Sequence, residues 1–361
     1  MYAASEAGAN ARRSCYPPWR VRARLPPSLL FFPGWAACGS TGEAPLVRFD
    51  ASVPPDAPSV FDASSDGGPG LRDSGVADGA LPPLPRFLGS WGGFGTQEGQ
   101  FVEPSSVELD SDGVVIVAGH EDRVQRFTRD GVLIDIFGEP GSGDGQFNHP
   151  HGLAVDRARG DLIYVGDQEN HRLQVFTREV VFLRQWGDAQ FAHIHDVGID
   201  PATGDVLVGD YELDTVRKFS STGALLATFG GPGAGPGLFS GVWGISTDSL
   251  RNIYVADTFN RRVQKLDPDG AFIMEWSRLG DEGFIKPTGV FVDGGDVVYV
   301  CDSLAQRVGL FDTEGTLLQR WDLTEILPMA TEPEDIVIDA AGRHIYIAEV
   351  LNHRVWHLVR D

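Results

Sequence analysis

The stretch that decides the fold is residues 147–186, FNHPHGLAVDRARGDLIYVGDQENHRLQVFTREVVFLRQW, because its pattern recurs along the chain. It begins with a Phe-x-x-Pro motif, after which an apolar run closes in Asp156. A second apolar run, Ile163–Asp167, leads into an Asn-x-Arg-Leu-Gln unit at 170–174, and Trp186 ends the stretch. Short runs of alternating apolar and polar residues, separated by turn residues, are typical of β-strands.

The pattern occurs six times. The opening motif recurs at Phe101, Phe147, Phe191, Phe239 and Phe284, and a sixth copy keeps Pro333. The closing aromatic residues are Trp91, Phe137, Trp186, Phe229, Trp276 and Trp321. Each unit has room for four short strands, and one antiparallel sheet of four strands cannot cover both of its own faces. Radial stacking of six such sheets covers them, so we predict an all-β, six-bladed β-propeller.

The two ends of the repeat region predict how the ring closes. The last copy stops at Leu358 without its aromatic fourth strand, whereas an unassigned strand, Phe87–Gly92, precedes the first copy. We predict that this N-terminal strand pairs as the outer strand of the last blade. The propeller then comprises residues 86–361.

Residues 1–42 have the composition of an export segment. They hold five Arg and one Glu, and the apolar run Leu25–Ala37 ends in small residues before Cys38. A cationic end, an apolar middle and small residues before a cleavage point are the signal-peptide pattern. We expect export, with Cys38 as the candidate lipidation residue of a membrane-tethered lipoprotein. Without lipidation the protein would be secreted or periplasmic, and translation from Val21 would give a more compact signal. The alternative to export is a disordered cytosolic tail.

Residues 43–85 are rich in Pro, Asp, Ser and Gly and poor in large apolar residues. Such a composition offers little apolar surface to offset the entropy of ordering. We predict a disordered linker that holds the propeller away from a membrane.

Composition excludes several classes of partner. The net charge is −22, of which residues 86–361 carry −21, and an acidic surface disfavours nucleic acid. The sequence has no run of about 18 apolar residues, so we predict no transmembrane helix. Three distant cysteines exclude a disulfide scaffold. We expect a monomer.

Three motifs resemble the NHL-repeat family across residues 86–361. These are Phe-x-x-Pro-x-Gly, the Tyr-Val-Ala-Asp strand at 254–257 and the Asn-x-Arg-Val-Gln unit at 260–264. The resemblance implies a six-bladed propeller. It implies little about function, because propellers host many activities.

Most of the repeated residues are predicted to serve structure. The acidic residues that end the second strands are Asp167, Asp210, Asp257, Asp302 and Glu349. We expect each to pair with an Arg about five positions later, and the closing aromatic residues to pack between blades. Cys301 occupies the place of Ala256 in its blade, so we expect a buried thiol.

Function is sought where the copies differ. The position after the recurring Pro begins the innermost strand, which lines the central channel of a propeller. This channel-mouth position reads Ser105, His151, His195, Trp243, Thr288 and Glu334. Secondary candidates flank it: His149, His193, Asp196 and Asp335. Residues i and i+2 of an extended strand share a side. We therefore expect His149 to lie beside His151, and His193 beside His195.

Imidazole and carboxylate side chains suit Zn²⁺ or another divalent cation. His151, His195 and Glu334 are therefore candidate ligands of an ion that could polarise a carbonyl or ionise a water. The alternative is a polar, water-filled mouth. The stretch Pro150–Leu153 also resembles the Pro-His-Gly motif of peptidyl-α-hydroxyglycine amidating lyases, which implies zinc, although Glu334 replaces one of the family's His ligands.

Two functions remain open. The first is an exported, surface-tethered propeller that binds or scaffolds a protein or small ligand on one face. The second is a metal-dependent lyase or hydrolase at the channel mouth.

Overall fold

The computed structural model describes residues 83–187 and 191–361. The predicted export segment 1–42, Cys38 and all but the last residues of the 43–85 linker lie outside the described residues. Within the described ranges, no helix has the length and apolar character needed to cross a membrane.

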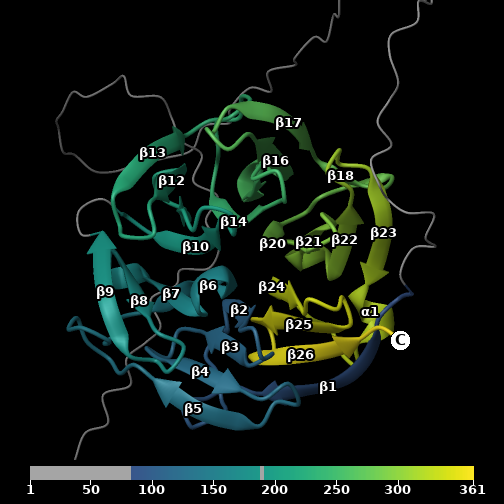
Figure 1. The fold of residues 1–361 in the computed structure, drawn as a ribbon. Coiled ribbons are helices and arrows are strands. Elements are labelled where there is room, and N and C mark those ends of the chain that lie inside the picture. Colours follow the sequence, from purple (N-terminus) through teal and green to yellow (C-terminus); the bar gives the residue numbers. More distant parts are fainter. Residues whose placement is uncertain (1–82, 188–190) are drawn as a thin grey trace, which may run out of the picture. The chain divides into compact units, whose positions relative to one another are not determined.

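Six antiparallel sheets of four strands are arranged around one central axis, and the first strand of each sheet lies nearest to it (Figure 1). Blade 1 contains β2 (Ser106–Leu109), β3 (Val115–Ala118), β4 (Val124–Phe127) and β5 (Leu133–Phe137). Blade 2 contains β6 (Pro150–Asp156), β7 (Leu162–Asp167), β8 (Arg172–Phe176) and β9 (Phe182–Gly187). Blade 3 contains β10 (Ile194–Ile199), β11 (Val206–Asp210), β12 (Thr215–Phe219) and β13 (Leu225–Gly230). The predicted six-bladed all-β fold is confirmed.

The second half of the ring has the same order. Blade 4 contains β14 (Val242–Thr247), β15 (Ile253–Asp257), β16 (Arg262–Leu266) and β17 (Phe272–Trp276). Blade 5 contains β20 (Pro287–Val292), β21 (Val298–Asp302), β22 (Arg307–Phe311) and β23 (Leu317–Asp322). Blade 6 contains β24 (Pro333–Ile338), β25 (His344–Glu349), β26 (Arg354–Val359) and β1 (Arg86–Gly92). Outside the blades are the short hairpin of β18 (Arg278–Leu279) and β19 (Glu282–Gly283), and the single turn α1 (Leu323–Ile326).

The ring closes as the sequence predicts. Strand β1 pairs antiparallel with β26, and Trp91 lies opposite Val355. The Trp91 ring packs at 5.7 Å from Phe127 of blade 1 and at 6.0 Å from Tyr346 of blade 6. The two ends of the propeller are thus held in one sheet and one interblade core (Figure 1).

The hydrophobic core lies between blades. Each cluster of buried apolar side chains joins two neighbouring blades, and each includes or contacts one of the closing aromatic residues. For example, Phe137 packs with Phe147 and Val165 of the next blade. The predicted interblade packing of these aromatic residues is confirmed, and so is the burial of the free Cys301.

Buried acidic residues tie the turns to the strands. Arg172 Nε lies 2.6 Å from Asp167 Oδ2, and the same distance is 2.7 Å for Arg262 to Asp257 and 3.0 Å for Arg307 to Asp302. Blade 3, which has Thr215 at the Arg position, brings Arg217 to 4.0 Å from Asp210.

The predicted pairing of this acidic residue with an Arg is wrong for blade 6. Among the described residues, no Arg forms an ion pair with Glu349. Its carboxylate instead accepts hydrogen bonds from Asn352 N at 2.6 Å and from Thr331 Oγ1 at 3.1 Å. Arg354 of this blade is directed instead to the outer strand β1, where its Nη1 lies 3.3 Å from Ser90 Oγ.

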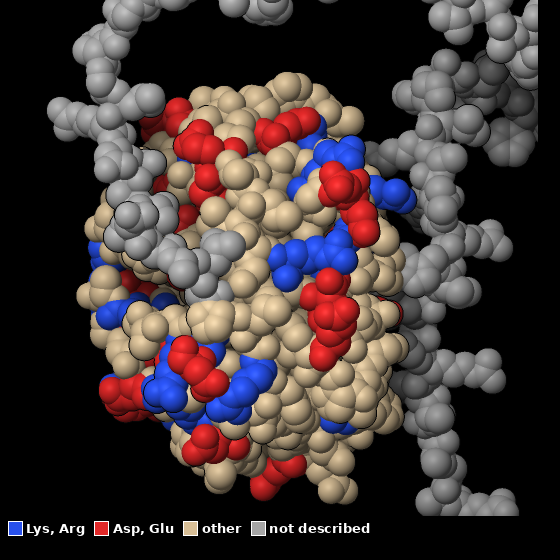
Figure 2. Space-filling model, turned by 90° about the vertical axis from the view of Figure 1, so that its right-hand side faces the viewer, with Lys and Arg blue, Asp and Glu red and all other residues tan. Residues whose placement is uncertain are grey.

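Opposite charges are interspersed on the side of the ring that carries β23. Figure 2 shows Lys and Arg side chains next to Asp and Glu, with broad uncharged areas between them. In this blade Arg320 lies 2.9 Å from Asp322 and 3.6 Å from Glu282. The net negative charge of the chain is therefore not gathered into one patch on this side.

Candidate functional site

The six predicted channel-mouth residues form one ring at the starts of the inner strands. Four of them each bond to a main-chain carbonyl of the next blade. The contacts are Ser105 Oγ to His151 O at 3.1 Å, His151 Nδ1 to His195 O at 2.8 Å, His195 Nδ1 to Trp243 O at 3.2 Å and Thr288 Oγ1 to Pro333 O at 3.0 Å. These bonds link the blades around the channel. We call the six residues the mouth ring.

Two residues of the mouth ring are joined across the channel, from blade 4 to blade 6. Trp243 Nε1 donates to Glu334 Oε1. Glu334 Oε2 lies 3.6 Å from Lys286 Nζ, which in turn lies 4.3 Å from the centre of the Trp243 ring. Glu334 is thus held by an indole and an ammonium group on the far side of the channel from His151.

The two histidines of the mouth ring are buried and neutral. Burial lowers the pKa of His151 and of His195 well below the ordinary value, and each is lowered further by a neighbouring His. A carbonyl oxygen only accepts, so Nδ1 carries the proton in both rings and Nε2 is the basic nitrogen. The ring centres of His151 and His195 lie 4.0 Å apart.

The secondary histidines lie in front of the strands and not within them. His149 has a positive φ of 63°, and β10 begins after His193, at Ile194. The expectation that both histidines of a pair share one side of an extended strand is wrong for His149 and His151, because the chain turns at His149. For His193 and His195 it stays a prediction. The ring of His149 is nevertheless parallel to that of His151, at 6.3 Å. Burial lowers the pKa of His149 to about 3.

The three candidate metal ligands are not gathered around one point. Within residues 83–187 and 191–361, no group of three or more His, Cys, Asp or Glu side chains is arranged to hold a metal ion. His151 and His195 are neighbours, whereas Glu334 is engaged by Trp243 and Lys286. The zinc site remains a prediction.

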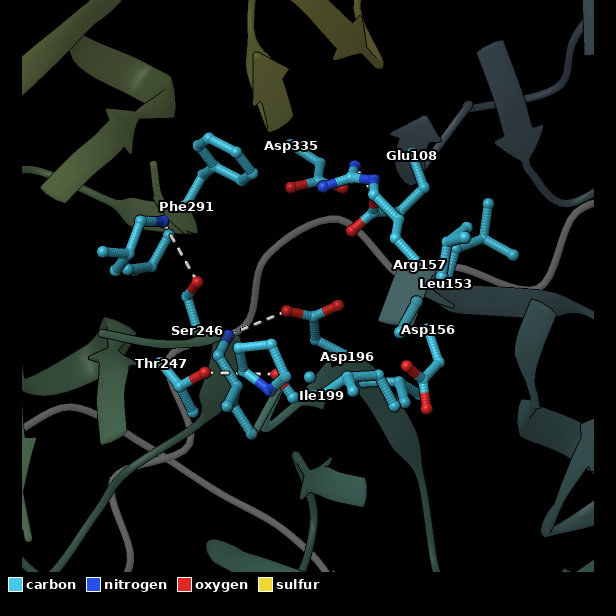
Figure 3. Close-up of a pocket in the computed structure, with 18 of the residues that line it drawn as sticks. Glu108, Leu153, Asp156, Arg157, Asp196, Ile199, Ser246, Thr247, Phe291 and Asp335 are labelled. Atoms are coloured by element: carbon cyan, nitrogen blue, oxygen red, sulfur yellow. Dashed lines mark hydrogen bonds and ion pairs between the residues drawn. The ribbon is translucent and has the colours of Figure 1, made fainter. Parts of the chain in front are cut away.

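Asp196 and Asp335 lie deeper in the channel, beyond the mouth ring. They line a pocket of about 320 Å³ with apolar walls that include Leu153, Ile245 and Phe291 (Figure 3). Asp196 Oδ2 accepts from Ile245 N at 2.8 Å, and Asp335 Oδ2 accepts from Val107 N at 2.9 Å. Each carboxyl therefore links its inner strand to that of the next blade.

These two carboxyls make stability depend on pH. Burial raises the pKa of Asp335 to about 7, and burial together with the charge of Asp335 raises the pKa of Asp196 well above its usual range. The unfolded pKa of an Asp is about 3.9, so folding favours the protonated form. The resulting stability is present below about pH 4 and is lost as pH rises through 7.

We expect Asp335→Asn to melt increasingly above the wild type as pH rises from 5 to 8. The amide keeps an acceptor for Val107 N and carries no charge to desolvate. Thermal melts at several pH values measure the difference, and Asp269→Asn, at an exposed turn, is the control. A constant difference between Asp335→Asn and wild type across this range would contradict the assignment.

The mouth ring is surrounded by turns between the second and third strands, whose residues the sequence did not predict as part of the site. His120 Nδ1 lies 3.1 Å from Glu103 Oε2, and its ring is centred 3.7 Å from that of His149. Tyr211 packs edge-on against Trp243 at 5.5 Å. Both residues begin the turn between the second and third strands of a blade. The six copies differ at this turn position, as they do at the mouth ring. A comparison of the copies would therefore have identified the turn position as a second variable site.

These turns and the segments before the inner strands form one end of the propeller, which we call the mouth face. The main chain joins them in each blade: His120 N to Val102 O, Gln168 N to His149 O, Tyr211 N to His193 O, Thr258 N to Gly241 O, Ser303 N to Lys286 O and Val350 N to Glu332 O. The mouth ring lies at the centre of this face. Fold and ring together define a six-bladed β-propeller whose mouth is lined by hydrogen-bonded side chains.

Comparison with known proteins identifies the repeats. The NHL-repeat family model matches residues 147–176, from just before β6 to the end of β8. Protein brain tumor of Drosophila melanogaster is 37% identical over 98 residues, which are 27% of this chain and 10% of that protein. NHL repeat-containing protein 3 of Mus musculus is 30% identical over 106 residues, 28% of this chain and 30% of its own length. The chain carries NHL-type repeats, as its motifs predict, and covers less than a third of either relative.

Solved structures with a similar fold include two lyases. A selenomethionine-substituted virginiamycin B lyase from Staphylococcus aureus has 12% identity and a TM-score of 0.51, covering 71% of this chain and 80% of that chain. A streptogramin B lyase has 12% identity and a TM-score of 0.54, covering 72% of this chain and 94% of that one. At this level of identity the likeness concerns the fold alone.

Proposed function

We propose that the propeller is a binding domain that holds a partner protein on its mouth face. The observation that carries this proposal is a set of half-exposed apolar side chains in the mouth turns: Phe259 at 51%, Leu304 at 49% and Leu351 at 48%. Ile285, in the segment before β20, is 48% exposed. Apolar side chains are also exposed at the opposite end of the blades, but those of the mouth face adjoin the ring of positions at which the copies differ. Exposed apolar side chains beside such a variable site favour association with another protein.

The condition of the mouth ring favours binding over catalysis. The Nδ1 atoms of both histidines and the carboxylate of Glu334 are used in contacts within the protein. The export segment and the tether that the sequence predicts would present this face outside the cytoplasm. Both belong to the proposal, and N-terminal sequencing of the mature chain tests them.

The lyase alternative rests on one feature, the adjacent neutral rings of His151 and His195. Their Nε2 atoms are basic and could bind a cation. Elemental analysis of untagged protein distinguishes the two functions. Stoichiometric zinc that is lost in a His151→Ala, His195→Ala variant would favour the enzyme.

The test of the binding function uses the full chain and a displayed random-peptide library. We expect enriched peptides to bind Phe259→Ser, Leu304→Ser, Leu351→Ser at least about tenfold more weakly than wild type, because truncation of apolar anchors removes most binding energy. The matched control is the triple variant Val132→Ser, Val181→Ser, Leu250→Ser. These three residues are exposed in turns at the opposite end of the blades. We expect that variant to bind like wild type.

Both variants should melt within a few degrees of wild type, since the side chains they change are half-exposed or more. Peptides that bind the two triple variants equally well would show that the mouth face is not the binding surface.

A further inference from the structure

The mouth face is divided by side-chain chemistry. The second residue of the turn after the second strand is Glu169 in blade 2 and Glu212 in blade 3, whereas it is Phe259, Leu304 and Leu351 in blades 4, 5 and 6. The turn of blade 1 carries Glu121, whose carboxylate accepts from Val102 N at 3.0 Å. One half of the face is therefore acidic and the other half is apolar.

The charges of the acidic half are accessible. Glu103, Glu169 and Glu212 are all at least partly exposed; the side chains of Glu103 and Glu169 are 45% and 50% exposed. His193, whose Nε2 lies 3.9 Å from Glu169 Oε1, does not favour a cancelling positive charge, because burial lowers its pKa. The bond from His120 lowers the pKa of Glu103, which stays ionised. A field of at least two full negative charges is thus open to a partner.

The apolar half begins where the acidic half ends. Tyr211, the neighbour of Glu212, packs against Phe259 at 5.8 Å, and Phe259 packs against Trp243 at 6.4 Å. The apolar surface continues through Ile285 and Leu304 in blade 5, where Ser303 N bonds to Lys286 O. The exposed Arg261 beside Phe259 disfavours further cations on this half. A partner that covers both halves meets aromatic and aliphatic side chains first, and carboxylates next to them.

We propose that the mouth face binds a protein segment that carries apolar side chains on one part and Lys or Arg on the adjoining part. This inference rests on the proposed binding function and names the chemistry of its partner. The apolar part covers Phe259, Leu304 and Leu351, and the cationic part meets Glu169, Glu212 and Glu103. Charge complementarity of this kind sets orientation and speeds association more than it adds affinity. Nucleic acid does not fit, because its phosphates would face the carboxylates.

The experiment takes peptides enriched by the wild-type full chain and compares them on two charge variants. One is Glu103→Gln, Glu169→Gln, Glu212→Gln. The other changes Asp130→Asn, Asp269→Asn, Glu314→Gln, three exposed acids in turns at the opposite end of the blades, and alters the net charge equally. We expect enriched peptides that are cationic as well as apolar. Their affinity should fall about tenfold on the first variant and stay unchanged on the second.

Salt and a neutral peptide give an independent readout. Between about 50 and 500 mM NaCl, binding to wild type should weaken clearly, whereas binding to the Glu103, Glu169, Glu212 variant should change little. Replacing Lys and Arg of an enriched peptide by Gln should make it bind wild type and this variant alike.

The possible results distinguish the inference about the partner's chemistry from the proposed binding function on which it rests. Neutral or acidic peptides that still require Phe259, Leu304 and Leu351 would overturn the inference and leave the binding function standing. Peptides that require none of these residues would overturn both. Binding of a single-stranded RNA oligonucleotide that weakens in the Phe259, Leu304, Leu351 triple variant would also overturn the inference.

Discussion

Deletion of residues 86–92 is expected to lower the melting temperature by at least about 10 °C. Truncating one buried aromatic residue costs about 3 to 5 kcal/mol, and each kcal/mol corresponds to roughly 2 to 4 °C in a domain of this size. The deletion removes all of β1, exposes the edge of β26 and takes Trp91 out of the core between blades 6 and 1. Phe87, which packs edge-on against Trp356 at 5.8 Å, is lost with it.

A deletion of equal length in the linker, residues 60–66, is the control and should change the melting temperature by no more than about 2 °C. The single change Trp91→Ala should give an intermediate result, because the strand would still pair with β26. If the strand deletion melts like the linker deletion, β1 does not close the ring in solution.

Replacement of Asp257 by Ala is expected to cost about 3 to 5 kcal/mol, since it removes the buried carboxylate that four donors share and leaves the buried Arg262 paired with the more exposed Glu275 alone. The side chain of Asp257 is fully buried and accepts four kinds of donor. These are Ser240 N at 2.7 Å, Asn260 Nδ2 at 2.9 Å, Arg262 Nε at 2.7 Å and Gln264 Nε2 at 2.9 Å. Chemical denaturation measures the loss.

The exposed Asp269 of the same blade is the matched control, and Asp269→Ala should change stability by less than about 0.5 kcal/mol. The double change Asp257→Ala, Arg262→Leu should recover part of the loss, because it also removes the buried guanidinium that has lost its buried partner. A double variant no more stable than Asp257→Ala would argue against a desolvated guanidinium as the cause.

The Asp257 network also bears on the mouth face. It joins Ser240, in the segment before β14, to Asn260 of the turn that presents Phe259. A mild loss of stability together with weaker peptide binding is therefore expected from Asp257→Asn, which keeps the shape of the side chain. This buried carboxylate orders one of the turns on which the proposed partner docks.

The repeat made the fold predictable from sequence. Phe101, Phe147 and their counterparts mark the start of each unit, and Trp91 to Trp321 mark the ends, so the blade number and the closing strand follow from the register of copies. Pairing of Asp with Arg was predictable for the same reason. Two blades depart from the pattern: Thr215 takes the Arg position in blade 3, and in blade 6 Arg354 is directed to Ser90 and not to Glu349.

The candidate site was predictable in part. Comparison of the copies places Ser105, His151, His195, Trp243, Thr288 and Glu334 in one ring, and the structure brings them there. The hydrogen-bond partners of individual side chains at the site were not predictable from the sequence. Glu334 bonds across the channel to Trp243, and Asp196 and Asp335 turn toward the inner strands of the next blades.

By itself, the sequence determined that residues 86–361 form six blades, because a repeat confines each copy to contacts with its neighbours and so to one shape. It also determined which positions meet at the channel mouth. Only the tertiary structure decided what those positions do. The division of the mouth face into Glu169 and Glu212 on one half and Phe259, Leu304 and Leu351 on the other follows from the order of blades around a closed ring. Hydrogen bonds across the channel and burial then set which charges remain free, and both depend on distances between residues far apart in the chain.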